Sequence, residues 1–169
     1  RGVNYHRLFS YSALVRPFDA ALAGNRVVLI ATAAALLAGF GRDNLHVIPV
    51  DECYAMRPDA LALAIEADRA AGRVPCAIVA TSGTTTTTAF DPLERVAAVG
   101  RAHGLWLHVD AAMAGSGMIL PECRDLWRGV EEADSLVLNA HKWLGAAFDC
   151  SLYYVRDPEH LVRVMSTNP

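Results

Sequence analysis

Short apolar runs rich in β-branched residues alternate with longer segments of helical periodicity, and this alternation constrains the fold more than any other feature. Runs that are apolar throughout are typical of strands covered on both faces of a sheet. The pattern predicts an α/β fold with a mainly parallel sheet. Pro49 makes one of the strands short or places it at a sheet edge. The expected strands span residues 26–31, 44–50, 74–80, 105–109, 134–138 and 150–155.

Proline, glycine and capping residues delimit three helices. The first is expected over residues 58–71, because this segment begins with a proline and is followed by a glycine. The second is expected to begin at a capping box formed by Asp91 and Glu94 and to end at Gly104. The third begins at Asp157 and the proline that follows it.

The composition argues against several classes of protein. The chain has 169 residues, 53% of them apolar, and a net charge of −3, so it can bury a core and lacks the basic excess of nucleic-acid-binding proteins. The longest apolar run, residues 27–41, is shorter than the ~20 residues of a membrane-spanning helix, and we identify no signal peptide. The four cysteines form no CxxC pair, which argues against a metal site and indicates reduced thiols in a cytoplasmic protein.

Residues 1–38 are harder to assign than the rest of the chain. Residues 4–18 show no clear period, and the strand expected over 26–31 runs into a helical segment at 33–38 with almost no loop. A parallel sheet needs a reversal of the chain at this point. Either the turn is very tight or the printed sequence omits residues here, and the sequence leaves both readings open.

Polar side chains follow three of the expected strands, at the edge of the sheet where ligands bind in open α/β folds. A hydroxyl-rich loop, residues 81–88, follows the first of these strands. Asp110 follows the second, with His108 two positions earlier on the same strand face. We expect all of these groups to converge on one crevice. The third strand is followed by Asn139, His141 and Lys142.

Each of these groups also has a simpler interpretation. Asp110 could cap a helix, Lys142 could be a solvated surface residue, and the threonines could form a plain polar loop. Two local contexts favour a ligand site. The mostly small residues 111–115 let a flat group approach the backbone. Lys142 stands between His141 and Trp143, where burial would favour a neutral, nucleophilic amine.

A lysine and a carboxylate at neighbouring strand ends, together with an anion-binding loop, match what pyridoxal phosphate requires. Its aldehyde needs an amine, its ring nitrogen needs an acidic partner, and its phosphate needs hydrogen-bond donors. The chain has no GxGxxG motif after a strand and no GxxxxGK[ST] motif, so dinucleotide binding and P-loop chemistry lack support.

Three segments carry a resemblance to a known family: SGTTTTTAFDP, HVDAAMAG and NAHKW, in this order. Over residues 39–169 the chain resembles the pyridoxal-phosphate-dependent group II amino-acid decarboxylases, and most of all their aromatic-L-amino-acid and tyrosine decarboxylase branch. The resemblance implies the large domain of fold type I, a three-layer αβα arrangement, and a homodimer with active sites at the interface. It also implies that residues 1–169 are part of that domain, with an N-terminal segment, a catalytic loop and a C-terminal small domain outside the chain.

The resemblance further implies roles for seven residues. Lys142 forms the Schiff base with the cofactor aldehyde, and Asp110 pairs with the ring nitrogen. His108 supports Asp110 or the substrate carboxylate. The remaining four bind the cofactor: Ala112 packs on one ring face, Thr85 lies near the ring oxygen and the substrate carboxylate, and Asn139 and His141 hold the phosphate.

The implied reaction is decarboxylation of a small-molecule substrate, an aromatic L-amino acid, to the amine and carbon dioxide. Alternatives with the same cofactor are a glutamate-type decarboxylase, an aldehyde-forming relative and an aminotransferase. A non-enzymatic alternative is an inactive family member that serves as an interaction protein. A flavodoxin-like binding module also fits the alternation of strands and helices, but it gives no function to Lys142 and Asp110. The family's ring-stacking histidine is not found near residues 31–35, so it is either lost or omitted there.

Overall fold

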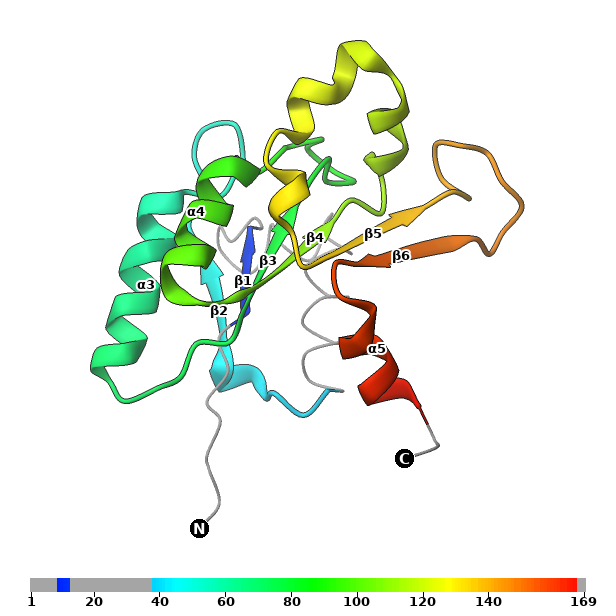
Figure 1. Ribbon diagram of the computed structural model, residues 1–169. Coiled ribbons are helices and arrows are strands. Elements are labelled where there is room, and N and C mark those ends of the chain that lie inside the picture. Colours follow the sequence, from blue (N-terminus) through cyan, green and yellow to red (C-terminus); the bar gives the residue numbers. More distant parts are fainter. Residues whose placement is uncertain (1–8, 13–37, 167–169) are drawn as a thin grey trace.

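The computed structural model describes residues 9–12 and 38–166 of the chain, and in these residues it contains one six-stranded sheet (Figure 1). The strand order is β2-β1-β3-β4-β5-β6. Neighbouring strands are parallel except for β5 and β6, which are antiparallel. The strands are β1 (Phe9–Ser12), β2 (Leu45–Ile48), β3 (Ala77–Thr81), β4 (Trp106–Asp110), β5 (Ser135–Asn139) and β6 (Ser151–Val155).

Helices lie on both faces of this sheet. Helices α3 and α4 lie side by side on one face, and α5 lies on the other (Figure 1), where the ring of its His160 meets the Trp106 ring edge to face. This arrangement confirms the expected α/β fold with a mainly parallel sheet. The helices are α3 (Pro58–Ala70), α4 (Leu93–His103) and α5 (Pro158–Met165), and short 3-10 helices span Arg42–Asn44, Gly115–Ile119, Pro121–Trp127 and Val130–Glu132.

The hydrophobic core lies between the sheet and the pair α3 and α4. Leu61 and Ile65 of α3 are fully buried, as the helical spacing predicts. On β4 the side chains of Leu107 and Val109 point into this core. Because side chains alternate along a strand, the residues between them face the opposite side of the sheet. No helix among the described residues is long and apolar enough to cross a membrane.

The structure tests two sequence expectations about strands and adds one strand. Among the described strands, β2 is short and lies at the edge of the sheet, which agrees with the prediction from Pro49. β3 begins only at Ala77, because Val74 is 51% exposed and lies outside the sheet. β1 was not predicted at all, since four residues without a clear period carry too little signal, and it is inserted between β2 and β3. The strand expected over residues 26–31 lies outside the described residues.

The expected capping box at α4 is wrong. The residue before this helix is Pro92, and no side chain caps the helix. The carboxylate of Asp91 instead accepts hydrogen bonds from the backbone N–H of Met56 at 2.7 Å and from that of Thr81 at 2.7 Å. A buried carboxylate is stabilised by such donors. Asp91 therefore binds the backbone of Met56 and Thr81, which are distant in sequence, and does not cap the N-terminus of α4. The expected cap at α5 is present, because Asp157 accepts from the N–H of Glu159.

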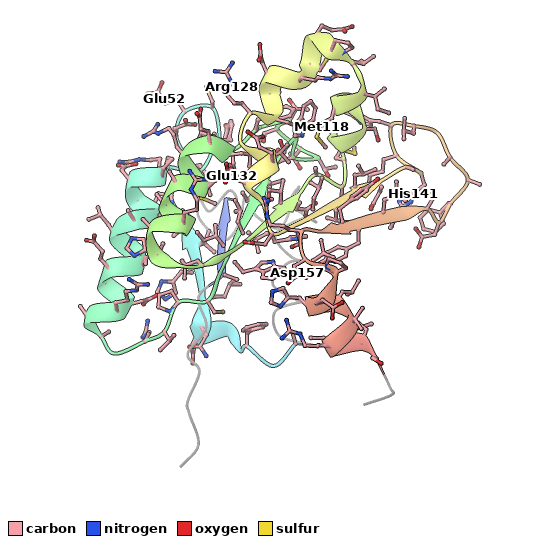
Figure 2. The ribbon with its side chains drawn as sticks, in the orientation of Figure 1. Glu52, Met118, Arg128, Glu132, His141 and Asp157 are labelled. Atoms are coloured by element: carbon pink, nitrogen blue, oxygen red, sulfur yellow. The ribbon has the colours of Figure 1, made fainter. Side chains whose placement is uncertain are left out.

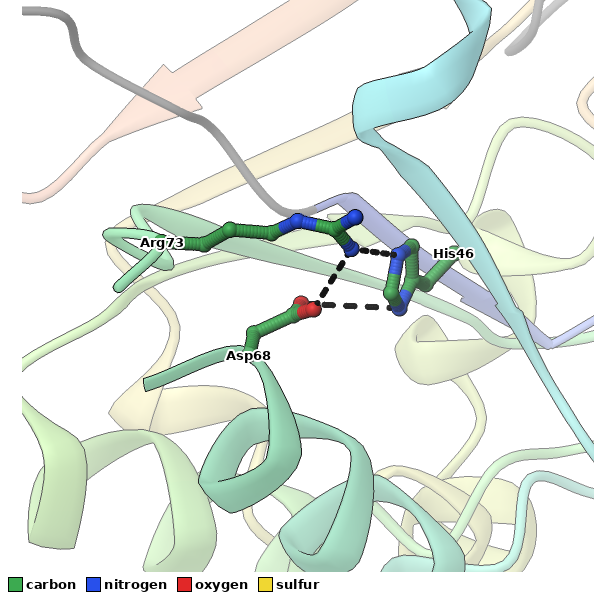
Figure 3. A network of polar contacts seen from close by, with 3 residues as sticks. All are labelled: His46, Asp68 and Arg73. Atoms are coloured by element: carbon green, nitrogen blue, oxygen red, sulfur yellow. Dashed lines mark hydrogen bonds and ion pairs between the residues drawn. The ribbon is translucent and has the colours of Figure 1, made fainter. Parts of the chain in front are cut away.

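A polar network ties the edge strand β2 to the end of α3 (Figure 3). The buried carboxylate of Asp68 accepts a hydrogen bond from Arg73 at 3.0 Å, and its second oxygen lies 3.4 Å from Nδ1 of His46. Arg73 also contacts Nε2 of the same imidazole at 3.3 Å. The three side chains hold one another in place, so they support the register of β2 against the rest of the sheet.

Candidate active site

A cavity of about 140 Å³ opens at the carboxyl ends of β3, β4 and β5. Its position is the one that open α/β sheets use for ligands. It brings together five of the seven residues singled out from the sequence. The lining residues are Thr81, Gly83, Thr84, Thr85, Asp110, Ala112, Met113, Asn139 and Lys142.

Backbone hydrogen bonds join the three strand ends beneath this cavity. The N–H of Ser82 donates to the carbonyl of Asp110 at 2.9 Å, which links the ends of β3 and β4. The N–H of Ala111 donates to Val137, and that of Asn139 donates to Ala112, which links the ends of β4 and β5. The polar side chains are therefore carried by a continuous backbone framework rather than by free loops.

Asp110 is held by its own local turn. One of its carboxylate oxygens, Oδ1, accepts a hydrogen bond from the N–H of Ala112 at 3.0 Å. Thr81 is its partner in the β3–β4 register, so both side chains lie on the same face of the sheet. The hydroxyl of Thr81 is buried and has no hydrogen-bond partner among the described residues. The sequence placed Thr81 in the hydroxyl-rich loop but assigned it no role; the signal that could have assigned one was the register between these two strands.

Lys142 follows β5 in a tight turn. Its N–H donates to the carbonyl of Asn139 at 3.1 Å, so the two residues are held together at the cavity. Lys142 is half-buried, whereas Trp143 and Leu144, which follow it, are 55% and 50% exposed. The expectation that Lys142 is not simply a surface residue is consistent with this burial.

The hydroxyls of the hydroxyl-rich loop, residues 81–88, fall into two groups: some hold the loop in shape and others face the cavity. The hydroxyls of Thr84 and Thr87 lie 2.6 Å apart, and that of Thr84 also accepts from the N–H of Ala89, so these groups shape the loop itself. Thr85 is exposed and lines the cavity. Gly83 has a φ of +78°, and a Cβ at this position would lie 2.1 Å from the Cβ of Ala114. Only glycine fits there, and the loop can therefore lie close to the residues after β4.

His108 and His141 lie beside the cavity but do not line it. Nδ1 of His108 is 2.8 Å from the hydroxyl of Ser135. Burial lowers the pKa of His108, and the negative charge of Asp110 acts in the opposite direction. His141 lies within the long connection between β5 and β6 (Figure 2), where its Nδ1 accepts a hydrogen bond from the backbone N–H of Cys150 at 3.0 Å.

A larger hollow of about 360 Å³ lies at the opposite ends of the strands, between α4, β4 and α5. Its ionisable groups already have partners: Arg101 pairs with Glu132, His160 lies beside Asp157, and Asp134 accepts a hydrogen bond from the N–H of Leu107. Glu132 and Asp157 are labelled in Figure 2. It contains no lysine and none of the residues singled out from the sequence. Size therefore does not decide between the two cavities, and the chemistry of the lining favours the smaller one.

Residues 19–169 match the family model of the pyridoxal-dependent decarboxylase conserved domain, which is most of the chain. The chain belongs to the pyridoxal-dependent decarboxylase family. This membership confirms the resemblance carried by the segments around Thr85, Asp110 and Lys142.

Individual relatives in this decarboxylase family agree with the assignment. A tryptophan decarboxylase of Camptotheca acuminata is 49% identical over 138 residues, which cover 80% of this chain and 28% of that protein. A phenylacetaldehyde synthase of Arabidopsis thaliana is 45% identical over 138 residues, with the same coverage of 80% and 28%. The chain therefore spans little more than a quarter of the length of these curated relatives.

A solved relative confirms the fold. The tryptophan decarboxylase of Catharanthus roseus, determined in complex with L-tryptophan, matches with a TM-score of 0.84 and 36% identity over 97% of this chain and 32% of that one. The expected fold-type I architecture is thus present in this chain.

The lining of the cavity fits pyridoxal phosphate. An amine, a carboxylate, an amide and several hydroxyls meet in one place, and these are the groups that the aldehyde, the ring nitrogen and the phosphate of the cofactor require. The buried hydroxyl of Thr81 adds a polar group for which the described protein offers no partner.

Proposed function

We propose that the protein carrying this chain is a pyridoxal-phosphate-dependent decarboxylase that converts an aromatic L-amino acid into the amine and carbon dioxide. The observation that carries the proposal is the single cavity lined by Lys142, Asp110, Ala112, Thr85 and Asn139. These residues come from three strand ends, so only the folded chain assembles them.

The chemistry divides between the cofactor and the residues of this chain. Pyridoxal phosphate, when bound, supplies an aldehyde that bonds to amines and a ring that accepts the electron pair released from a substrate bond. Lys142 offers its amine to the aldehyde and gives way to the substrate amine. Asp110 holds a proton on the ring nitrogen by its negative charge, and the hydrogen bond from Ala112 orients its carboxylate for this task.

The other residues position the cofactor and the substrate. Ala112 is small enough to let the flat ring lie against the backbone after β4. The amide of Asn139, which lines the cavity, and the imidazole of His141, which lies beside it, are assigned to the phosphate by the family resemblance. The hydroxyl of Thr85 is assigned to the ring oxygen and the substrate carboxylate. His108 is assigned to the support of Asp110.

The relatives favour an aromatic substrate. The names of the compared proteins refer to tryptophan or to phenylacetaldehyde, which both carry an aromatic ring. The phenylacetaldehyde synthase keeps aldehyde formation as a second candidate. Glutamate decarboxylation has weaker support, because a solved glutamate decarboxylase domain from Vibrio parahaemolyticus is 25% identical to this chain, compared with 36% for the tryptophan decarboxylase.

We further propose that residues 1–169 form part of a larger cofactor-binding domain and that the protein acts as a homodimer with its active sites at the interface. Exposed apolar side chains on the segment after Lys142, namely Trp143, Leu144 and Phe148, support a partner surface beside the cavity. All four cysteines are free thiols, which supports the cytoplasmic location expected from the sequence.

The cofactor assignment is tested by borohydride reduction of the full-length protein saturated with pyridoxal phosphate, followed by peptide mapping. The pyridoxyl group should be found on Lys142. The matched control is Lys142→Arg, which keeps the positive charge but cannot form the bond, and it should take up no label. A label on another lysine, or the same label in both proteins, would refute the assignment.

The reaction is tested by competition among tyrosine, dopa, tryptophan, phenylalanine and glutamate, with the amine, carbon dioxide, aldehyde and ammonia all measured. Aromatic amino acids should be consumed faster than glutamate and give the amine with carbon dioxide. Aldehyde and ammonia in place of amine would assign the second candidate function. Preference for glutamate would refute the aromatic assignment while leaving decarboxylation in place.

A further inference from the structure

Three side chains of β4 form a row on the sheet face opposite α4: Trp106, His108 and Asp110. Ser135 of β5 is the register partner of His108. Its hydroxyl oxygen lies 2.9 Å from Nε1 of Trp106 and 2.8 Å from Nδ1 of His108. One buried hydroxyl therefore bridges two rings of the row that ends at the cavity.

The direction of these hydrogen bonds follows from the chemistry of the groups. The indole N–H of Trp106 can only donate, so the oxygen of Ser135 accepts from it. The hydroxyl hydrogen of Ser135 then needs an acceptor, and within the described part of the chain the only further polar contact of this hydroxyl is Nδ1 of His108. The reverse arrangement would leave a buried hydroxyl hydrogen unpaired, which is unfavourable. Nδ1 is therefore the acceptor, and the hydrogen of the neutral ring lies on Nε2.

The surroundings of His108 also favour the neutral ring. Burial lowers the pKa of His108 and outweighs the opposing charge of Asp110. The neighbouring side chains on the other strands are Val79 on β3, Ser135 on β5, and Tyr153 on β6, whose ring stacks against the imidazole with centroids 6.1 Å apart. Among the described residues of the strands, the titratable groups that face His108 are Asp110 and Tyr153, and His160 of α5 lies on the same face of the sheet against the Trp106 ring.

We propose that Ser135, oriented by Trp106, is a positioning residue that keeps His108 neutral with its hydrogen on Nε2, so that no second positive charge competes with the cofactor's ring nitrogen for Asp110. The inference rests on the proposed function, because that function assigns Asp110 to the ring nitrogen. The physical reason is electrostatic. A protonated His108, two residues from Asp110 on the same strand face, would repel a protonated ring nitrogen and weaken the pairing that Asp110 provides.

The first test measures the imidazole itself in the full-length, cofactor-free protein. Histidine labelled with ¹³C and ¹⁵N reports the tautomer and the pKa by NMR, and the His108 signal is assigned by its loss in His108→Gln. In the wild type the hydrogen should lie on Nε2. In Ser135→Ala the pKa of His108 should rise by about 0.5–1 unit, because the neutral ring loses its donor at Nδ1. Trp106→Phe should shift it in the same direction, since it frees the hydroxyl to rotate.

Two variants serve as matched controls. Ser135→Thr retains the hydroxyl and should keep the wild-type signal. Ser116→Ala removes another buried serine hydroxyl, one without a hydrogen-bond partner among the described residues, and should leave His108 unchanged. A hydrogen on Nδ1 in the wild type, or an unchanged or lowered pKa in Ser135→Ala, would overturn the proposal.

The second test follows cofactor binding by absorbance across the pH range in which the NMR titration of Ser135→Ala shows His108 becoming protonated. As the pH falls through that range, Ser135→Ala should lose affinity for pyridoxal phosphate about 3- to 10-fold more than the wild type does, because its His108 is protonated at a higher pH. Equal pH dependence of the two proteins would refute the role toward Asp110. If the wild type failed to bind pyridoxal phosphate at all, the proposed function would be wrong, a result separable from the NMR outcome.

Discussion

The N–H of Ala112 donates a hydrogen bond to Oδ1 of Asp110 at 3.0 Å, within a turn that begins where β4 ends. The bond fixes one carboxylate oxygen, and Oδ2 has no hydrogen-bond partner in the part of the chain that the structure describes. Ala112, which is assigned to one face of the cofactor ring, therefore also orients Asp110, which is assigned to the nitrogen of that ring.

Asp110→Asn should separate the charge of this side chain from its shape. The amide oxygen of asparagine can still accept from Ala112, but the negative charge is lost. Release of carbon dioxide by the cofactor-saturated, full-length protein should fall by at least ~10²-fold, on the scale of losing a preorganised electrostatic partner. Asp125→Asn is the control, since this carboxylate is on the surface beside Arg128 and its loss should not change turnover. Near wild-type turnover in Asp110→Asn would show that Asp110 has a structural role and no electrostatic role in the reaction.

Thr81→Val should weaken cofactor binding without destabilising the fold. Valine has nearly the same shape, and the buried hydroxyl it removes has no partner among the described residues, so the free energy of unfolding of the cofactor-free protein should stay the same or rise, by at most about 1–3 kcal/mol. Loss of one neutral hydrogen bond should raise the dissociation constant for pyridoxal phosphate about 2- to 10-fold, measured by fluorescence titration. Thr81→Ser should retain the affinity. A loss of stability with unchanged affinity would show that the hydroxyl serves the fold.

Gly83→Ala should destabilise the protein more than Gly72→Ala. Both glycines have a positive φ, which costs a residue with a Cβ about 1–2 kcal/mol. Only the Cβ at position 83 meets a neighbour, Ala114, at 2.1 Å, and such overpacking adds about 1–3 kcal/mol. Urea unfolding should therefore show a larger loss at position 83. Equal losses at the two positions would mean that the loop moves away from Ala114 at little cost.

Asp91→Ala and Asp157→Ala compare two aspartates that precede helices. Removing Asp91 leaves the buried N–H groups of Met56 and Thr81 without their carboxylate partner, at a cost of about 2–5 kcal/mol in the free energy of unfolding. Removing Asp157 deletes an exposed helix cap, at about 1 kcal/mol. Chemical denaturation of both variants checks the order. If Asp157→Ala were the more destabilising, the bridging role of Asp91 would be wrong.

Local patterns in the sequence determined the strands that carry the site and the residues at their ends. Apolar runs mark β3, β4 and β5 because buried strands must be apolar, and the residue after such a run must lie at the sheet edge. Asp110 and Lys142 could be singled out in this way, and the NAHKW and HVDAA segments named the family. These signals are local because a strand's burial and its end are properties of a few consecutive residues.

Contacts between distant segments decided the rest. Thr81 joins the cavity through its register with Asp110, Asp91 binds two remote backbone groups instead of capping α4, and Ser135 bridges Trp106 and His108 across two strands. No spacing along the chain encodes these pairs. A polar group bonds to whichever partner the packed elements bring within about 3 Å, and that partner is known only once the strands are in register.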